Sequence, residues 1–381
     1  MVESETVRTP SRSRRANADR PIDFRSDTVT KPTKQMRAAM AAAEVGDDVL
    51  DGDPTTRELE ERVADLVGAS AGLWTPSGTM GNIIALMSHV GRGDAFLAPS
   101  GSHVLDDELG AASWLAGGTP RPLEHDAGPG RVSPAAVRRA AGSPGPYFAL
   151  RTRLLCLENT HNQAGGVITP PEQHAAVVAA ARGAKLAVHL DGARLWHAAV
   201  ALGVPPGALT VGVDTVQVCL SKGLGAPAGS VVAGSTEFVE QARRLRKMLG
   251  GGMRQNGVLA AAGMVALDGI DRLAEDHERA RTLAIGLSER GWQASTPETN
   301  IVLVAVADLR GTLQRLAGVG VQVAPMGGKV RFVTHADLSD TDIKDALNRI
   351  GAVDRGRTED PGTGRAPLSR VGRAAARPAG Y

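Results

Sequence analysis

Short apolar segments recur between residues 71 and 233, and most of them stop at a polar or glycine residue just before an amphipathic helix. This alternation of strands and helices predicts an α/β fold, with a mostly parallel sheet that is covered by helices on both faces. Ligands of such sheets bind beyond the carboxyl ends of the strands. We predict strands at residues 73–74, 95–98, 154–157, 186–190, 216–220 and 230–233. The last strand follows its predecessor closely enough to run antiparallel.

The chain is long enough for two domains. It has 381 residues, of which 42% are hydrophobic and 22% are charged, as in an ordinary globular enzyme. After residue 266 the chain no longer repeats strand–helix units, and short strands are mixed with helices as in a small α+β domain. We predict a disordered tail over residues 1–21, a large domain over 22–265, a small α+β domain over 266–352 and a second disordered tail over 353–381.

Charge and cysteine content limit the function classes. The 43 basic and 41 acidic side chains leave a net charge of +2, which argues against a nucleic-acid surface. Cys156 and Cys219 both lie in apolar segments, as expected for reduced, buried thiols. No segment approaches the roughly 18–20 apolar residues of a membrane span, and the arginine-rich start lacks the apolar core of a secretory signal. We therefore expect a cytoplasmic protein without nucleic-acid or membrane partners.

One lysine stands at the end of a predicted strand. The strand over 216–220 ends at Ser221 and Lys222, and Gly223-Leu-Gly225 follows. A lone lysine in this position usually extends its ammonium group to water past an apolar stem. In a pocket of low dielectric constant, the same amine can instead attack a carbonyl group. The rest of the sequence must decide between these readings.

Two further features favour a binding site for pyridoxal 5'-phosphate (PLP). Asp191 ends the strand before that of Lys222, although alone it could be a turn or a helix cap. Ser77-Gly-Thr79 opens a helix, and a helix N-terminus binds phosphate. PLP enzymes need a lysine for the Schiff base, a carboxylate for the pyridine nitrogen and a phosphate site. The three features together therefore favour PLP.

Several motifs resemble those of the L-threonine aldolases, PLP enzymes of the aspartate-aminotransferase-type fold. The resemblance extends from about Asp23 to Ile350. It implies a PLP fold of type I, with a mostly parallel seven-stranded sheet in the large domain and a small C-terminal α+β domain. The motifs are Arg25-Ser-Asp-Thr-Val-Thr-Lys-Pro32, Gly46-Asp-Asp-Val49, Asp53-Pro-Thr55, Leu157-Glu-Asn-Thr-His161, His189-Leu-Asp-Gly-Ala-Arg194, Leu220-Ser-Lys-Gly-Leu-Gly225 and Gly250-Gly-Gly-Met-Arg-Gln-Asn256.

The resemblance also implies roles for individual residues. Lys222 would form the Schiff base, and Asp191 would pair with the pyridine nitrogen. His103 would stack on the ring and act as the base. Without the resemblance, His103 would be read as a capping or surface histidine. Other implied cofactor-binding residues are Ser77, Gly78, Thr79, Arg194, Ser221 and Arg254, the last from a neighbouring subunit. The implied ligands of the substrate carboxylate are Ser26, Arg194 and Arg331. Glu108 matches an acidic residue near the site or lies on a solvated helix face, and no metal is expected.

The implied activity is cleavage of L-threonine, L-allo-threonine or a related β-hydroxy-α-amino acid into glycine and an aldehyde, by retro-aldol scission of Cα–Cβ. The implied assembly is a homotetramer, a dimer of dimers with shared active sites. Alternatives are a β-eliminating lyase, a transaldolase that transfers glycine, and a PLP-binding protein without turnover. A nicotinamide-dependent oxidoreductase is disfavoured, because no Gly-x-Gly-x-x-Gly follows the first strand.

The chain departs from the family pattern at two places. Leu50 stands where the family usually has a tyrosine that contacts the site across the subunit interface. Tyr147 or Phe148 occupies the region of a histidine that assists with the substrate hydroxyl. We expect these departures to alter the preference for substrate stereochemistry or size.

Overall fold

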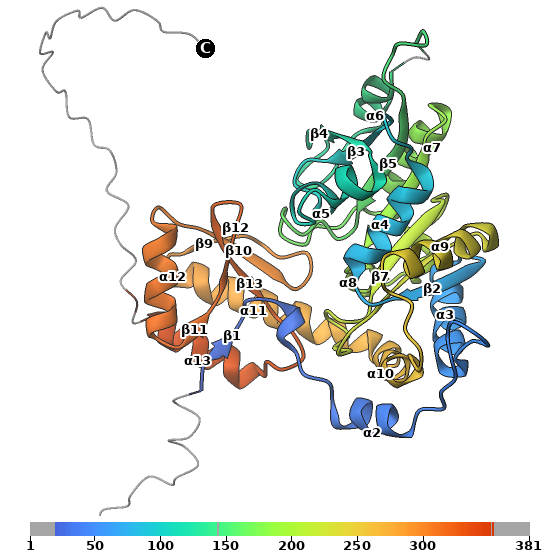
Figure 1. The fold of residues 1–381 in the computed structure, drawn as a ribbon. Helices are drawn as coiled ribbons and strands as arrows, with labels where there is room; N and C mark the ends of the chain where they lie inside the picture. The colour runs from blue at the N-terminus through green and yellow to red at the C-terminus, as the bar shows by residue number, and fades with distance from the viewer. Residues whose placement is uncertain (1–19, 143–144, 352, 354–381) are drawn as a thin grey trace, which may run out of the picture.

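A seven-stranded sheet forms the centre of the large domain (Figure 1). The computed structural model describes residues 20–142, 145–351 and 353, so most of both predicted tails lies outside the described residues. The strand order is β2-β8-β7-β6-β5-β3-β4. All neighbours from β7 to β4 are parallel, whereas β8 is antiparallel to both β2 and β7. The predicted fold class and the antiparallel direction of β8 are confirmed.

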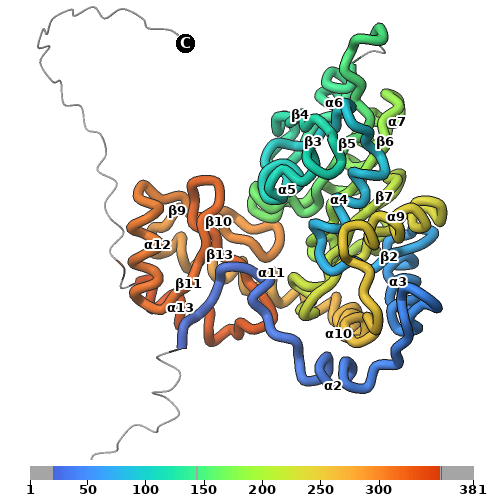
Figure 2. The backbone as a smooth tube through the Cα atoms, viewed as in Figure 1, coloured from blue at the N-terminus to red at the C-terminus, as the bar shows by residue number. Residues whose placement is uncertain are grey.

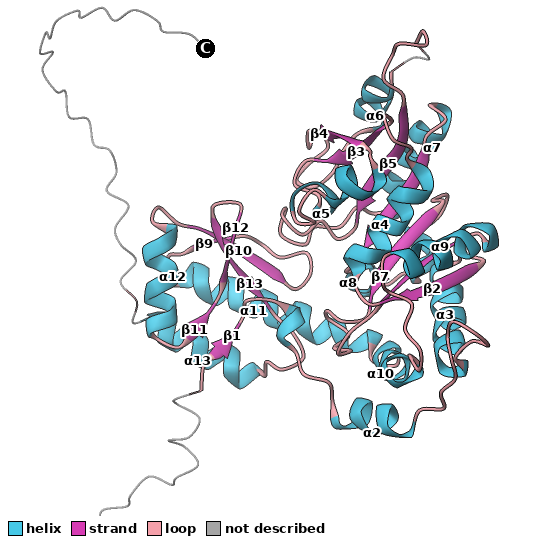
Figure 3. Cartoon of the chain, viewed as in Figure 1, coloured by secondary structure: helices cyan, strands magenta, loops and turns pink. Residues whose placement is uncertain are grey.

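The elements of the large domain follow the predicted alternation (Figure 3). Its sheet strands are β2 (Ala71–Thr75), β3 (Ala95–Pro99), β4 (Thr119–Leu123), β5 (Thr152–Glu158), β6 (Ala187–Gly192), β7 (Thr215–Cys219) and β8 (Ser230–Gly234). Its α-helices are α2 (Lys34–Ala42), α3 (Pro54–Val67), α4 (Gly78–His89), α5 (His103–Asp106), α6 (Pro134–Ala141), α7 (Pro171–Gly183), α8 (Leu195–Leu202), α9 (Thr236–Met248) and α10 (Gly257–Leu267). Short helical turns are η1 (Asp27–Val29), η2 (Ala112–Ala116), η3 (Pro206–Leu209) and η4 (Ile270–Arg272).

Helices cover both faces of this sheet. Successive residues of β5 point to opposite faces, so Leu154 packs in one hydrophobic cluster and Leu155 in another. The first cluster includes residues of α4 and η2, and the second includes residues of α3, α6, α7, α8 and α10. A strand buried on both faces explains why the sequence of β5 is continuously apolar rather than alternating.

The small domain is an antiparallel sheet packed against three helices. Its four strands are ordered β12-β13-β10-β9. The elements are α11 (Leu273–Glu289), β9 (Gln293–Ala294), β10 (Ile301–Ala305), α12 (Leu309–Gly318), β11 (Val321–Gln322), β12 (Ala324–Met326), β13 (Lys329–Val333) and α13 (Asp340–Gly351). Among the described residues, no helix is both long and apolar enough to cross a membrane.

The start of the described chain belongs with the small domain, which differs from the predicted assignment of residues 22–265 to the large domain. Strand β1 (Ile22–Asp23) pairs in parallel with β11 (Figure 2). The ring of Phe24 packs edge-to-face on that of Phe332, with the ring centroids 5.6 Å apart. The chain then crosses to α2, which packs on α10. The pairing partner of a two-residue strand lies about 300 residues away, so local sequence patterns could not identify it. The other domain boundaries remain a prediction.

Two further elements differ from expectation. The sequence pattern of residues 105–115 predicts one helix, but the helix is broken after α5, because Leu109 and Gly110 have φ values of 55° and 73° in the left-handed region. Strand β4 was not predicted because it contains Pro120 and Pro122. It lies at the edge of the sheet, where proline is tolerated because one side of the strand needs no hydrogen-bond donors.

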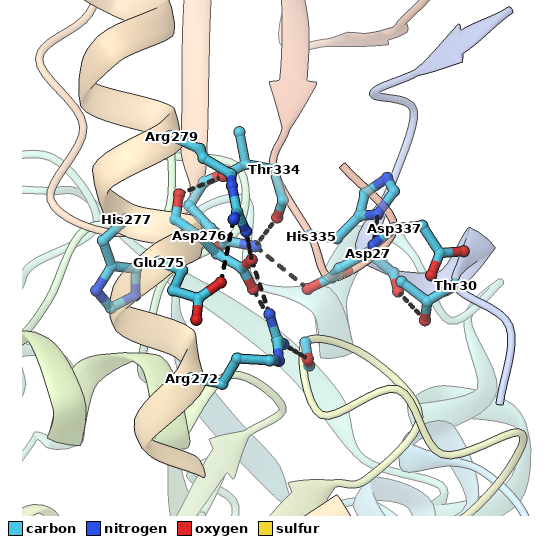
Figure 4. A network of polar contacts seen from close by, with 12 residues as sticks. Asp27, Thr30, Arg272, Glu275, Asp276, His277, Arg279, Thr334, His335 and Asp337 are labelled. Atoms are coloured by element: carbon cyan, nitrogen blue, oxygen red, sulfur yellow. Dashed lines mark hydrogen bonds and ion pairs between the residues drawn. The ribbon is translucent and has the colours of Figure 1, made fainter. Parts of the chain in front are cut away.

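A polar network joins the small domain to the loop after β7 (Figure 4). Arg272 donates to the carbonyl of Gly223 at 2.7 Å and pairs with the buried Asp276 at 3.0 Å. The Thr334 hydroxyl donates to the Asp276 carbonyl at 2.6 Å. The loop that carries Lys222 is therefore held by a hydrogen-bonded chain that extends into the small domain.

Candidate active site

An open pocket lies at the carboxyl edge of the large sheet. It has a volume of about 360 Å³, which is in the range of small-molecule sites. Strands β2, β6 and β7 end beside it. Its lining includes Ser77, Gly78, Thr79, Asn82, His103, Asp191, Ser221 and Lys222. Residues predicted from distant parts of the sequence therefore meet in one place.

Lys222 follows β7 and lines this pocket. Its side chain is half-buried and makes no hydrogen bond or ion pair with any residue that the structure describes. The next residue must be glycine, because a Cβ at Gly223 would collide with the ring of His197. The amine is thus exposed to the pocket on a closely packed loop.

The start of α4 forms one wall of the pocket. Ser77 caps the helix, and its hydroxyl accepts a hydrogen bond from the N–H of Met80 at 3.2 Å. A Cβ at Gly78 would lie only 2.9 Å from atoms of Cys219 and Gln217, so glycine lets the helix approach the sheet. Free N–H groups and the positive end of the helix dipole suit this wall to a phosphate group.

Asp191 and Glu108 lie on either side of Asn82. The side-chain nitrogen of Asn82 donates to Asp191 Oδ2 at 2.7 Å and to Glu108 Oε1 at 2.8 Å. The other oxygen of Asp191 accepts from the N–H of Ala193 at 3.0 Å. Both carboxyl groups are buried. Glu108 is therefore buried behind Asn82 and His103, which line the pocket, and does not lie on a solvated helix face.

His103 is held from two sides. Its backbone N–H donates to Glu158 Oε2 at 2.7 Å, and its ring Nδ1 lies 2.9 Å from Glu108 Oε1. Burial acts to lower the pKa of His103, but the hydrogen bond to Glu108 and the charge of Asp191 raise it, and the net shift is upward. An Nδ1–H that donates to Glu108 leaves the lone pair on Nε2, so this imidazole can accept a proton.

Glu158 is a fully buried carboxyl group at the end of β5. Burial and the charge of Asp191 raise its pKa to about 7. Its two oxygens accept from the N–H groups of His103 and Asn162, at 2.7 and 2.8 Å. Glu158 thus holds the backbone at the start of α5 and in the loop after β5.

The two arginines predicted to bind a carboxylate have different surroundings. Arg194 is buried in an ion pair with Asp27, whose oxygens accept at 2.7 and 2.8 Å. Burial acts to raise the pKa of Asp27, but Arg194 holds it well below the ordinary value. The positive charge of Arg194 is therefore already compensated, and Arg194 does not line the pocket.

Arg331 forms no ion pair with the described residues. Its guanidinium donates to Asn162 Oδ1 at 3.1 Å and to the carbonyl of Arg25 at 3.0 Å, and its Nε is buried without a partner. Burial lowers the pKa of Arg331 to about 10, and Arg194 contributes to the shift, so Arg331 is still charged near neutral pH. Ser26 follows Arg25, and its hydroxyl accepts from the N–H of Thr28 at 3.2 Å. Of the two arginines, Arg331 is therefore the better candidate to bind an anionic ligand.

Some predicted site residues lie away from this pocket within one chain. Arg254 is 53% exposed and pairs with Asp47 at 3.2 Å. Leu50 is 75% exposed on the neighbouring loop. Tyr147 and Phe148 are also exposed, and they precede β5, whereas the pocket residues follow the carboxyl ends of strands. None of these four residues lines the pocket.

The sequence reasoning missed three polar residues of the site: Asn82, Asn162 and Asp27. Asn82 could have been noticed because it is a lone amide in the apolar helix Gly78–His89. Asp27 lies within a recognised motif and Asn162 directly follows another, but their roles depend on contacts with residues more than 30 positions away.

The donor set fits PLP. An unpaired amine, a buried carboxylate, an imidazole and a helix N-terminus line the same pocket, and each matches one part of that molecule. Lys222, Asp191, His103 and the turn Ser77–Thr79 would hold it.

Comparisons with known proteins agree with this description. The family model for beta-eliminating lyases matches residues 23–309. The chain is 44% identical to the probable low-specificity L-threonine aldolase 2 of Arabidopsis thaliana, over 91% of this chain and 98% of that protein. It is 41% identical to the low specificity L-threonine aldolase of Escherichia coli O157:H7, over 84% of this chain and 95% of that protein.

Solved structures share the fold. The Leishmania major threonine aldolase has a TM-score of 0.74 at 18% identity, covering 87% of this chain and 100% of that chain. A serine palmitoyltransferase from S. paucimobilis with bound PLP–myriocin has a TM-score of 0.67 at 19% identity, covering 87% and 86%. On the family match and the identity to its curated relatives, this chain belongs to the beta-eliminating lyase and threonine aldolase family.

Proposed function

We propose that this protein is a PLP-dependent aldolase that cleaves L-threonine, L-allo-threonine or a related β-hydroxy-α-amino acid into glycine and an aldehyde. The observation that carries the proposal is the meeting of Lys222, Asp191 and the Ser77–Thr79 turn in one pocket. The names of the curated relatives, low-specificity L-threonine aldolases at 41–44% identity, support the same reaction.

PLP, when bound, supplies an electron-withdrawing ring that accepts the electron pair left on Cα as the Cα–Cβ bond breaks. Lys222 provides the amine that anchors the cofactor. Asp191 provides the carboxylate that keeps the ring nitrogen protonated. The N–H groups at the start of α4 bind the phosphate.

The substrate is held from the small-domain side. Arg331 binds the substrate carboxylate with its planar, charged guanidinium, and Ser26 adds a hydroxyl. Arg194 keeps this wall in place by neutralising Asp27 and by sharing Asn162 Oδ1 with Arg331, at 3.2 Å and 3.1 Å. Its role is therefore to position Arg331.

His103 takes the proton of the β-hydroxyl group at Nε2. Glu108 orients the ring by accepting from Nδ1, and Glu158 fixes the backbone of His103. This arrangement of a base and its orienting carboxylate is the usual one in general base catalysis.

We further propose that the protein acts in the cytoplasm as a homotetramer, a dimer of dimers with shared active sites. The exposed positions of Arg254, Leu50 and Phe148 support this assembly, because none of the three lines the pocket of its own chain and each is open to contact with a neighbouring subunit. Large apolar side chains that are exposed in a single chain, such as Leu50, are also typical of surfaces that a neighbouring subunit covers.

Product analysis tests the reaction. The purified holoenzyme is incubated with L-threonine and, separately, with L-allo-threonine, and glycine, acetaldehyde, ammonia and 2-oxobutanoate are quantified. The proposal predicts glycine and acetaldehyde in equal amounts. Ammonia with 2-oxobutanoate would instead indicate the β-eliminating lyase. Acetaldehyde without free glycine, formed only when a second aldehyde is added and together with a new β-hydroxy-α-amino acid, would indicate the transaldolase. Cofactor binding without any product would indicate a protein without turnover.

A further inference from the structure

We propose that Asn82, His189 and Thr215 form a polarised chain of hydrogen bonds that positions the carboxylate of Asp191 against the cofactor ring nitrogen. The inference rests on the proposed function and extends it to positioning residues behind the pocket. Asn82 and Asp191 line the pocket, whereas His189 and Thr215 lie buried behind them.

The chain of contacts is continuous. His89 Nε2 lies 3.1 Å from Thr215 Oγ1, which lies 2.9 Å from His189 Nδ1. His189 Nε2 lies 3.0 Å from Asn82 Oδ1. The amide nitrogen of Asn82 then reaches Asp191 Oδ2 at 2.7 Å and Glu108 Oε1 at 2.8 Å.

The chemistry of the partners fixes the direction of every bond. Both neighbours of the Asn82 nitrogen are carboxyl oxygens, so both of its hydrogens are used there and its Oδ1 must accept. His189 therefore donates from Nε2. Burial lowers the pKa of His189 to about 4, so the ring is neutral near pH 7 and its Nδ1 must accept from the Thr215 hydroxyl. Thr215 Oγ1 is then free to accept from His89.

The backbone places these groups in line. His189 and Asp191 are two residues apart on β6, so their side chains share one face. Thr215 is the cross-strand partner of His189 on β7. Asn82 and His89 are seven residues apart on α4, which covers the same face.

Every hydrogen in the chain from Thr215 onward points toward Asp191. Aligned dipoles of this kind strengthen one another in a buried site, so each hydrogen bond helps to hold the next one in place. Asn82 also separates two buried carboxyl groups that would otherwise repel. Without the chain, the amide could turn its oxygen toward Asp191, and the carboxylate would lose both its donor and its orientation.

The test measures cofactor affinity with two compounds. Apo-protein is titrated with PLP and with its analogue in which a C–H group replaces the ring nitrogen. Asn82→Leu is expected to raise the Kd for PLP by about 10- to 100-fold, which is the usual loss when a residue that hydrogen-bonds to a ligating group is removed. Thr215→Val, which is nearly isosteric, is expected to raise it by about 3- to 10-fold, and Thr215→Ser to restore most of the affinity. The Kd for the analogue should change less than about twofold, because the analogue cannot pair with Asp191.

Thr210→Val is the matched control, because Thr210 is another buried threonine whose hydroxyl donates to the Val67 carbonyl at 2.6 Å and which lies outside the pocket lining. It should leave both Kd values unchanged. The inference is overturned if both Asn82→Leu and Thr215→Val bind PLP like wild type, or if they lose PLP and the analogue equally, since equal losses indicate general damage. A wild-type protein that binds no PLP would overturn the proposed function and this inference together.

Discussion

The carboxylate of Asp27 accepts two hydrogen bonds from the guanidinium of Arg194, at 2.7 and 2.8 Å, and both side chains are buried. This ion pair neutralises Arg194, which is one of the two arginines that the family resemblance assigns to the substrate carboxylate. Arg331 shares Asn162 with Arg194 but has no acidic partner among the described residues. The two arginines should therefore respond differently to mutation.

Arg194→Met is expected to destabilise the protein by about 3–5 kcal/mol, because it leaves Asp27 buried and charged without its partner. Chemical denaturation of the apo-protein measures the loss. Arg281→Met is the control: Arg281 pairs with Glu278 at 2.8 Å, but the two side chains are 50% and 68% exposed, and the loss of such a pair costs about 0–1 kcal/mol. Equal, small losses in both variants would contradict the structural role of Arg194.

Arg331→Lys is expected to lower kcat/KM for L-threonine by about 10- to 100-fold, because an ammonium group cannot bind a carboxylate at two points. The free energy of unfolding and the affinity for PLP should stay near wild type, since Arg331 is predicted to touch the substrate and not the cofactor. Steady-state kinetics together with a PLP titration separates these effects. A variant with normal kinetics would remove Arg331 from the substrate site.

The pH dependence of kcat/KM should show an acid limb that lies above pH 6.5, the ordinary pKa of histidine. Burial acts to lower the pKa of His103, but the hydrogen bond to Glu108 and the charges of Asp191 and Glu108 together outweigh it, and the pKa is raised. His103 therefore keeps its proton to a higher pH, and activity falls as the pH drops through this raised value, because only the neutral imidazole accepts a proton.

Glu108→Gln should move this limb to lower pH, since it removes the acidic partner of Nδ1. The comparison uses pH profiles of the two holoenzymes at the same ionic strength. A limb that keeps its position in Glu108→Gln would show that another group controls the rate.

Shared sites predict complementation between two inactive variants. Lys222→Ala lacks the anchoring amine, and Arg254→Ala lacks the arginine that we assign to the neighbouring site. Mixing and reassembling the two in equal amounts should recover roughly a quarter of wild-type activity, because half of random dimers are hybrids and one of the two sites in each is intact. Activity no higher than that of the separate variants would place Arg254 outside the neighbour's site.

Phe148→His should change the ratio of activities toward L-threonine and L-allo-threonine, because it restores a titratable donor where the family has one. Within one chain Phe148 is 77% exposed, so the effect requires contact with another subunit. Phe148→Leu serves as the control for lost aromatic area. Identical ratios in all three proteins would refute a role for this position in stereochemical preference.

The sequence was most informative where chemistry depends on the ends of strands. Lys222, Asp191 and Ser77 could be placed at one edge because β7, β6 and β2 all point their carboxyl ends the same way. The seven-stranded sheet and the small C-terminal domain were implied by the family resemblance, and both are present. The strand pattern alone predicted six of the seven strands and missed β4.

What the sequence could not show depends on contacts between distant segments. Three such contacts join residues that no local sequence pattern connects. They are the pairing of β1 with β11, the ion pair between Arg194 and Asp27, and the hydrogen bonds from Asn82 to two carboxyl groups. The break after α5 depends on two left-handed residues, one of them Leu109, a residue type that rarely adopts this conformation.

The central claim is that Lys222 anchors the cofactor. The most direct test is to reduce the PLP-loaded protein with borohydride, digest it and locate the phosphopyridoxyl group by mass spectrometry. The account predicts one modified peptide that contains Lys222, and no such peptide in Lys222→Ala. A label on another lysine, or on none, would contradict it.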